Sequence, residues 1–169
     1  MFSILRKIVK TGHLTEKLPT HDRAVAQLST TCQTEIMRVF GKSLSIRMVD
    51  AGSCNGCELE MNALNNSFYD IERFGIHFVA SPRHADLLLV TGPVSRHMQA
   101  ALKRTYDAMP APKLVIAMGD CGADGGEFGV SYASCGAVAN VIPVDAVIRG
   151  CPPTPVQLLQ GILELLQRF

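Results

Sequence analysis

The sequence contains no tryptophan and only three tyrosines among its 169 residues. Aromatic platforms on which nucleic-acid bases could stack are therefore scarce. Neither sign of charge dominates, because 16 lysines and arginines are balanced by 15 aspartates and glutamates. The formal net charge of +1 provides no electrostatic footprint for nucleic acid, and we expect no nucleic-acid partner.

Long hydrophobic runs are also missing from the chain. No run reaches the length of about 18 apolar residues that suggests a transmembrane helix, and the most apolar stretch, 137–148, is interrupted by Asn140, Pro143 and Asp145. The opening residues lack the apolar core and the cleavage site of a signal peptide. We therefore expect a cytoplasmic protein, in which six cysteines point to metal or redox chemistry rather than to disulfides.

The length suits a single domain with one hydrophobic core, which we expect to comprise residues 21–169. Residues 1–20 are expected to form an N-terminal extension. A short helix there would have an apolar side and a basic side, the latter with Arg6, Lys7 and Lys10. Such a helix suits a membrane surface or a partner protein, and the alternative is a frayed, solvated terminus.

Apolar periodicity predicts strands that alternate with helices along the domain. Strands are expected at 43–50, 75–80, 86–91, 113–118 and 141–148. Helices are expected at 22–40 with Asp22 as N-cap, at 57–73, at 95–108 and at 155–168, with a glycine-rich loop at 119–129. This alternation indicates an α/β fold in which helices cover both faces of an open parallel sheet.

Four of the six cysteines lie just after predicted strands. Cys54 and Cys57 follow the first strand, Cys121 follows the fourth and Cys151 follows the fifth. The carboxyl ends of parallel strands share one edge of a sheet, and open α/β folds bind their ligands there. We therefore expect these four thiols to meet, although they are far apart in the sequence.

Glycine and proline flank these cysteines. In Cys54-x-x-Cys57 two sulfurs can reach one metal centre from a single turn, and Gly56 is expected to permit the tight backbone. Glycines on both sides of Cys121 are expected to let backbone N–H groups approach a cluster and tune its potential. Pro152 is expected to stiffen the loop that carries the fourth cysteine.

A cubane iron–sulfur cluster and a zinc ion both accept four cysteine thiolates. Structural zinc usually uses two local C-x-x-C pairs, whereas here one pair is joined by two distant single cysteines, which favours iron–sulfur. Four unrelated core cysteines are the remaining alternative. The other cysteines, Cys32 and Cys135, are expected to be small buried hydrophobic residues, and His77, His84 and His97 to be structural histidines.

Five ordered motifs resemble those of the 20-kilodalton iron–sulfur subunit of respiratory NADH:quinone oxidoreductase. They resemble still more the small subunit of membrane-bound, energy-converting [NiFe]-hydrogenases, including formate hydrogenlyase. The resemblance covers roughly residues 43–168. The motifs are C-N-G-C-E-L-E at 54–60, S-P-R-H-A-D at 81–86, T-G-P-V at 91–94, G-D-C-G at 119–122 and G-C-P-P-T-P at 150–155.

One departure separates the two branches of this family. The respiratory subunit has two adjacent cysteines where this chain has the spaced pair of the hydrogenase form. The resemblance therefore implies a flavodoxin-like fold and one [4Fe–4S] cluster whose iron is bound by Cys54, Cys57, Cys121 and Cys151. In an oxidoreductase complex of hydrogenase type, this chain would be the electron relay, and the hydrogen-activating [NiFe] site would lie in a partner large subunit.

The resemblance also implies other partners and a location. No further cysteine motif follows Cys151, so a ferredoxin-like iron–sulfur subunit is expected to connect the cluster to the next carrier. Membrane-embedded subunits of the same complex would hold the chain peripherally at the inner face of the cell membrane.

Glu60 matches a glutamate that both branches place after the second cysteine. The resemblance suggests that it relays protons or tunes the cluster, and the alternative is an acid favoured in the first turn of a helix. Two other functions of the chain stay open. One is an electron carrier to quinone in a respiratory-type complex whose large subunit lacks nickel, and the other is a zinc-stabilised scaffold subunit.

Overall fold

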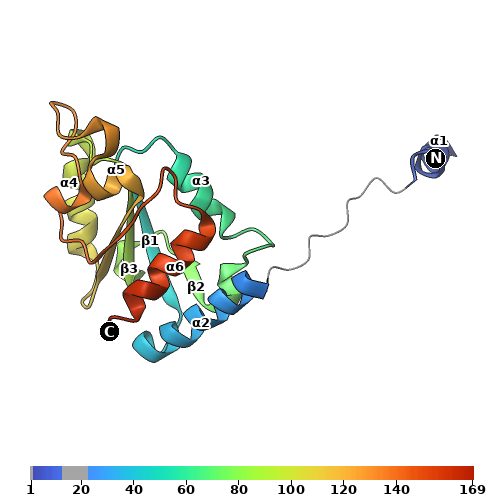
Figure 1. Ribbon diagram of the computed structural model, residues 1–169, viewed down its shortest axis with the longest axis horizontal. Helices are drawn as coiled ribbons and strands as arrows, with labels where there is room; N and C mark the ends of the chain where they lie inside the picture. Colours follow the sequence, from blue (N-terminus) through green and yellow to red (C-terminus); the bar gives the residue numbers. More distant parts are fainter. Residues whose placement is uncertain (1, 13–22) are drawn as a thin grey trace.

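The computed structural model describes residues 2–12 and 23–169 of the chain (Figure 1). Five strands form one parallel sheet in the order β2-β1-β3-β4-β5. This is the strand order of flavodoxin-like folds, and the expected fold class is confirmed. The strands are β1 (Leu44–Asp50), β2 (Ile76–Phe78), β3 (Leu87–Thr91), β4 (Leu114–Met118) and β5 (Ala146–Ile148).

The α-helices in the described residues lie before, between and after these strands. The shortest of them, α5, is a brief segment at the carboxyl edge of the sheet. They are α1 (Phe2–Thr11), α2 (Arg23–Phe40), α3 (Gly56–Ala63), α4 (Arg96–Ala108), α5 (Gly119–Asp124) and α6 (Pro155–Leu166).

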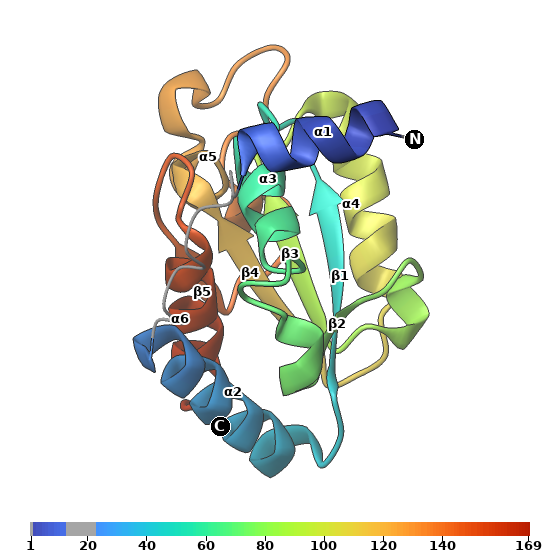
Figure 2. The same cartoon turned by 90° about the vertical axis from the view of Figure 1, so that its right-hand side faces the viewer.

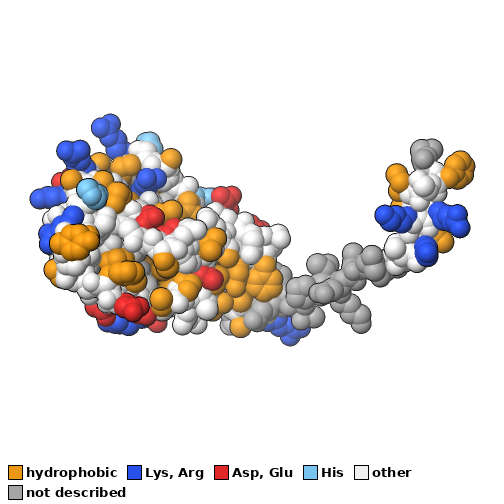
Figure 3. All heavy atoms as spheres, turned by 90° about the horizontal axis from the view of Figure 1, so that it is seen from above, with side chains coloured by type: hydrophobic (Ala, Val, Ile, Leu, Met, Phe, Trp, Pro, Cys, Tyr) orange, Lys and Arg blue, Asp and Glu red, His pale blue; other side chains and the backbone are white. Residues whose placement is uncertain are grey.

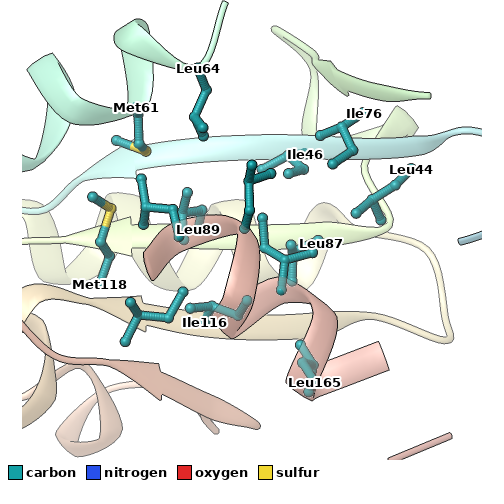
Figure 4. Close-up of a cluster of buried hydrophobic side chains, with 14 of the residues drawn as sticks. Leu44, Ile46, Met61, Leu64, Ile76, Leu87, Leu89, Ile116, Met118 and Leu165 are labelled. Atoms are coloured by element: carbon teal, nitrogen blue, oxygen red, sulfur yellow. The ribbon is translucent and has the colours of Figure 1, made fainter. Parts of the chain in front are cut away.

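One face of the sheet is covered by α2, α3 and α6 (Figure 2). Their buried side chains pack against alternate residues of the strands, because successive side chains of a strand point to opposite faces. Figure 4 shows Met61 from α3 and Leu165 from α6 on either side of a row that includes Ile46, Leu89 and Ile116. This layer holds the larger of the two hydrophobic clusters.

The opposite face is covered by α4 and by the segment that follows α5. Leu102 of α4 and Val138 belong there to one cluster with Leu88, Val90 and Val115 from the strands. Every residue of β3 is buried, so this central strand has no face in contact with water. Apolar runs of this kind are typical of parallel strands enclosed between two helical layers.

Capping residues define the ends of the predicted helices. The Ser95 hydroxyl accepts a hydrogen bond from the Met98 backbone N–H at the start of α4 (3.3 Å). Thr154 and Gln157 form a capping box at the start of α6. Gly41 follows the last residue of α2 with a φ of 64°, a conformation that favours glycine.

The helix expected at 57–73 is wrong in its second half, because α3 ends at Ala63. The side-chain oxygen of Asn66 accepts hydrogen bonds from the backbone N–H groups of Phe68 (2.8 Å) and Tyr69 (3.0 Å). Such local bonds compete with helical ones. The apolar pattern beyond Ala63 therefore belongs to a turn.

Two further expectations need correction. The loop expected at 119–129 begins with the helix α5, so Cys121 lies on a helix. The strand expected at 141–148 is confined to its last three residues, β5. Pro143 has no N–H to donate to a ladder, which explains why the strand does not begin earlier.

Two expectations lie outside the described residues. Asp22 as the N-cap of α2 and the boundary at residue 20 both fall in the segment 13–22. The assignment of residues 21–169 to one domain stays a prediction.

Candidate functional site

The carboxyl ends of four neighbouring strands are aligned across the sheet. Asp50, Thr91, Met118 and Ile148 are the last residues of β1, β3, β4 and β5, and each is the register partner of the next. The loops and helices that follow these strands therefore all begin at the same edge of the sheet. This alignment gathers at one edge the segments that carry the four candidate cysteines.

The four cysteines line a single pocket at that edge, as the parallel topology predicts. We call it the cysteine pocket. Small residues make up most of the remaining wall, and Asp120 is the one charged residue of the described lining. The lining residues are Ser53, Cys54, Gly56, Cys57, Gly92, Gly119, Asp120, Cys121, Gly150, Cys151 and Pro152.

The first two cysteines lie on a loop that β1 and α3 fix at both ends. The Asp50 carboxylate accepts hydrogen bonds from the backbone N–H groups of Gly52 and Ser53, both at 2.8 Å. The tight turn before α3 is made by Asn55, whose φ of 70° is left-handed, and not by Gly56 as expected. Asparagine tolerates this conformation better than most residues.

A carboxylate that the sequence analysis did not select lies behind this loop. Glu58 is only 5% exposed, and it accepts hydrogen bonds from the hydroxyl of Ser53 (2.6 Å) and from that of Thr91. It therefore joins the first cysteine loop to the end of β3. An acid next to Cys57 was visible in the sequence, but its two hydroxyl partners are brought to it only by the fold.

The third and fourth cysteine segments are tied to each other by a reciprocal pair of hydrogen bonds. The Asp120 N–H donates to the Gly150 carbonyl (3.0 Å), and the Gly150 N–H donates to the Asp120 carboxylate (3.1 Å). Arg149 adds an ion pair to Asp124 at 2.9 Å. These contacts fix Cys121 and Cys151 relative to each other, although 30 residues separate the paired positions.

Two glycines allow the backbone to approach this closely. A Cβ at Gly119, whose φ is 80°, would lie 2.9 Å from the Cys57 sulfur. A Cβ at Gly92, with a φ of 74°, would lie 2.5 Å from the Ser53 nitrogen. Neither position can hold a larger residue without displacing the wall of the cysteine pocket.

The thiols differ in exposure, and their mutual proximity changes their acidity. Cys57 is buried, Cys121 is half-buried, and Cys54 and Cys151 are exposed. The pKa of Cys57 is raised to about 12, chiefly by burial. The negative charges of Glu58 and of the other three cysteines add to this increase. Burial and the charge of neighbouring thiolates also raise the pKa of Cys121. Four thiolates here would repel one another unless a cationic centre bound them.

The donor set suits an iron–sulfur cluster, because four thiolates and glycine backbone surround one space. Among the described residues, no three His, Cys, Asp or Glu side chains are arranged to hold one metal ion.

The remaining candidate residues lie elsewhere. Cys32 and Cys135 are buried, as expected, and the Cys32 thiol donates to the Leu159 carbonyl at 3.6 Å. Glu60 is half-buried on α3, beyond the first turn in which it was expected. Its side chain makes no hydrogen bond to another residue within 2–12 and 23–169.

The three histidines also lie away from the described lining of the cysteine pocket. His77 is half-buried in β2, and His84 and His97 are exposed. Their predicted structural role is not tested by these positions.

Curated relatives come from membrane-bound and other redox complexes. The chain is 43% identical over 147 residues to formate hydrogenlyase subunit 7 of Escherichia coli, covering 87% of this chain and 56% of that protein. It is 42% identical over 135 residues to the probable membrane-bound hydrogenase subunit mbhJ of Pyrococcus furiosus, covering 80% and 81%. It is 47% identical over 113 residues to a subunit of the F(420)H(2) dehydrogenase of Methanosarcina mazei, covering 67% and 61%. The chain thus spans just over half the length of the Escherichia coli relative.

Solved structures share the architecture. A chain of the membrane-bound sulfane sulfur reductase, an archaeal respiratory membrane complex, superposes with a TM-score of 0.67 at 37% identity, covering 80% of this chain and 74% of that one. A chain of an NAD⁺-reducing [NiFe]-hydrogenase superposes with a TM-score of 0.58 at 16% identity, covering 75% and 93%. The second likeness concerns the fold alone.

The match to a family model agrees with the motifs and the fold. It extends over residues 54–165, which include all four cysteines of the pocket. Together with relatives above 40% identity, it confirms the resemblance drawn from the motifs. The chain belongs to the family of the NADH ubiquinone oxidoreductase 20 kDa subunit, in the company of formate hydrogenlyase and membrane-bound hydrogenase subunits.

Proposed function

We propose that this chain is an electron-transfer subunit that holds one proximal [4Fe–4S] cluster through Cys54, Cys57, Cys121 and Cys151. The observation that carries the proposal is that four thiols from three separate strand ends line one pocket. The relatives are subunits of oxidoreductase complexes, which supports the same role.

The cluster would supply one-electron exchange, and the protein would hold it and set its surroundings. Cys57 would bind it from the buried side, next to the backbone of Gly119. Cys54 and Cys151 would bind it from the exposed side. That side leaves the pocket open toward a partner, whose contact would exclude water from the cluster.

We infer that the partner is the large subunit of a membrane-bound hydrogenase complex, with the hydrogen-activating [NiFe] site. A ferredoxin-like iron–sulfur subunit would carry electrons onward, and membrane-embedded subunits would complete the complex. The names formate hydrogenlyase and membrane-bound hydrogenase among the relatives support this assembly. The chain would then lie peripherally, on the cytoplasmic face of the membrane.

Glu60 is proposed as a proton relay of the assembled complex. It lies on α3, three residues after Cys57, and is half-buried. A Glu60→Gln variant is expected to lower hydrogen turnover by the assembled complex while the cluster signal stays unchanged. Unchanged turnover would remove the relay and leave Glu60 as a residue of the helix surface.

A second candidate function is to carry the cluster in a respiratory-type complex whose large subunit lacks nickel. The relatives from F(420)H(2) dehydrogenase and from sulfane sulfur reductase favour it, because their names state reactions other than the turnover of hydrogen. Metal analysis of the purified complex separates the candidates. Iron with nickel supports the hydrogenase, iron without nickel supports the second candidate, and zinc contradicts both.

The ligand assignment is tested by electron paramagnetic resonance of the reduced complex. The Cys121→Ala variant is expected to lose the signal of the proximal cluster. Cys32→Ala is the matched control, because Cys32 is a cysteine buried outside the cysteine pocket. A cubane signal that is the same in Cys121→Ala, Cys32→Ala and the unmodified complex would refute the assignment.

A further inference from the structure

The N-terminal helix α1 separates its side chains into two sides. At 3.6 residues per turn, five apolar residues fall within one half of its circumference, and Ser3, Arg6, Lys7, Lys10 and Thr11 fall within the other. The apolar side is exposed to solvent. Its exposed fractions are 87% for Phe2, 64% for Ile4, 54% for Leu5, 59% for Ile8 and 84% for Val9.

The charge of α1 has one sign. Arg6, Lys7 and Lys10 are its charged residues, and it contains no aspartate or glutamate. These three cations exceed the formal net charge of the whole chain, which is +1, so the rest of the sequence is net negative. Figure 3 shows the lysine and arginine side chains of α1 exposed beside its hydrophobic ones. Attraction to an anionic surface is therefore concentrated on this helix.

We propose that α1 lies in the surface of an anionic membrane. The apolar side would be buried at the boundary between headgroups and acyl chains, and the three cations would contact lipid phosphates. Ten residues of helix extend only about 15 Å, half the thickness of the hydrocarbon layer, so α1 lies along the surface. In agreement with this orientation, none of the described helices has the length and hydropathy to span a bilayer.

A lipid surface explains the composition of α1 better than a protein groove does. All charges of α1 are positive, so a protein groove would have to face them with acidic side chains, whereas an anionic lipid surface presents phosphates to all three. Basic side chains beside an apolar side are typical of helices that bind anionic lipid. The relatives named as membrane-bound hydrogenase and as part of a respiratory membrane complex agree with such a contact.

The proposal is independent of the cysteine assignment, and its test uses the purified full chain. Vesicles of phosphatidylcholine with about one third phosphatidylglycerol are mixed with the protein and floated on a density gradient. We expect the chain to float with these vesicles, and at least tenfold less with vesicles of phosphatidylcholine alone, because each basic residue near an anionic surface contributes to binding.

Matched variants separate the two sides of the helix. Ile8→Glu is expected to weaken vesicle binding at least tenfold, whereas Met37→Glu, at an exposed apolar position on α2, leaves it unchanged. The double variant Lys7→Glu with Lys10→Glu is expected to lose binding to the anionic vesicles. The same charge change made with Lys103→Glu and Arg104→Glu, exposed on α4, is expected to retain most of it.

The outcomes are decisive because the far-ultraviolet circular dichroism of each variant reports whether the domain is folded. A folded chain that binds neither kind of vesicle would overturn the proposal. Equal binding by Ile8→Glu and Met37→Glu would also overturn it. If the unmodified chain does not bind vesicles and the Ile8→Glu variant no longer joins the assembled complex, the proposal is overturned and α1 binds a protein partner instead. Loss of the cluster signal in any variant would concern the cysteine pocket and not this helix.

Discussion

The hydrophobic layer beneath α2 and α6 and the carboxyl edge of the same sheet are built in opposite ways. In the layer, apolar side chains from five strands and three helices are buried. At the edge, exposed thiols, left-handed residues and close backbone contacts are concentrated. The difference teaches that stability arises from the layer, whereas the edge has the open and constrained backbone that the proposed cluster site requires.

The largest effect on stability is expected in the hydrophobic layer. Ile116→Ala removes a fully buried side chain from β4 and is expected to lower the free energy of unfolding by about 2–5 kcal/mol. Chemical denaturation of the purified chain measures the change. Val147→Ala on β5, where the side chain is 46% exposed, is the control and should change it by about 0.5 kcal/mol or less. Equal effects would contradict the comparison.

At the edge, the expected effect is on assembly more than on stability. Gly119→Ala places a methyl group 2.9 Å from the Cys57 sulfur, and we expect it to lower the free energy of unfolding by about 1–3 kcal/mol and to prevent cluster incorporation. Iron content per chain is the measurement. Gly129→Ala has a similar positive φ of 53° but meets no atom within 4 Å, so it should lose stability and retain iron. Iron loss in both variants would point to backbone strain and not to the cysteine pocket.

The carboxylate behind the edge is expected to have a smaller effect. Glu58→Gln retains the shape of the side chain but replaces one acceptor of the hydroxyl bonds from Ser53 and Thr91. We expect the free energy of unfolding to fall by about 1 kcal/mol. Glu60→Gln on the same helix is the control and should leave it unchanged. A drop of the same size in both variants would show that the two hydroxyl bonds of Glu58 add no stability of their own.

The smallest effect is expected on thiol reactivity. Burial raises the pKa of Cys32 to about 11 from the ordinary thiol value of 9.0, so at pH 8 this thiol is protonated and unreactive. In the cluster-free chain, iodoacetamide should modify the exposed Cys54 and Cys151 well before Cys32. Mass spectrometry of peptides after timed labelling checks the order. Early labelling of Cys32 would show that α2 separates readily from α6.

Much of the fold could be predicted from local sequence. The alternation of short apolar runs with longer helical patterns placed β3 and β4, and the helix predicted at 95–108 is α4. The helix predicted at 57–73 is wrong beyond Ala63. The apolar residues there are buried in the core, but the side chain of Asn66 accepts backbone hydrogen bonds that turn the chain. Periodicity measures burial, and burial alone does not separate a helix from a compact turn.

The candidate site divides in the same way. The residue types and their places after strands were enough to predict that Cys54, Cys57, Cys121 and Cys151 meet, since parallel strands end at one edge. Nothing local could select Glu58, whose partners are on the preceding loop and on a strand 33 residues away.

The sequence by itself determined the central strands, the order of the chemical motifs and the two-sided pattern of α1, because each depends on residues close together along the chain. Only the tertiary structure decided how deeply each thiol is buried, which glycine lies against a cysteine sulfur and which hydroxyls donate to the buried carboxylate. Those features depend on distances between segments that are far apart in the sequence, and such distances are fixed only when the helices pack on the sheet.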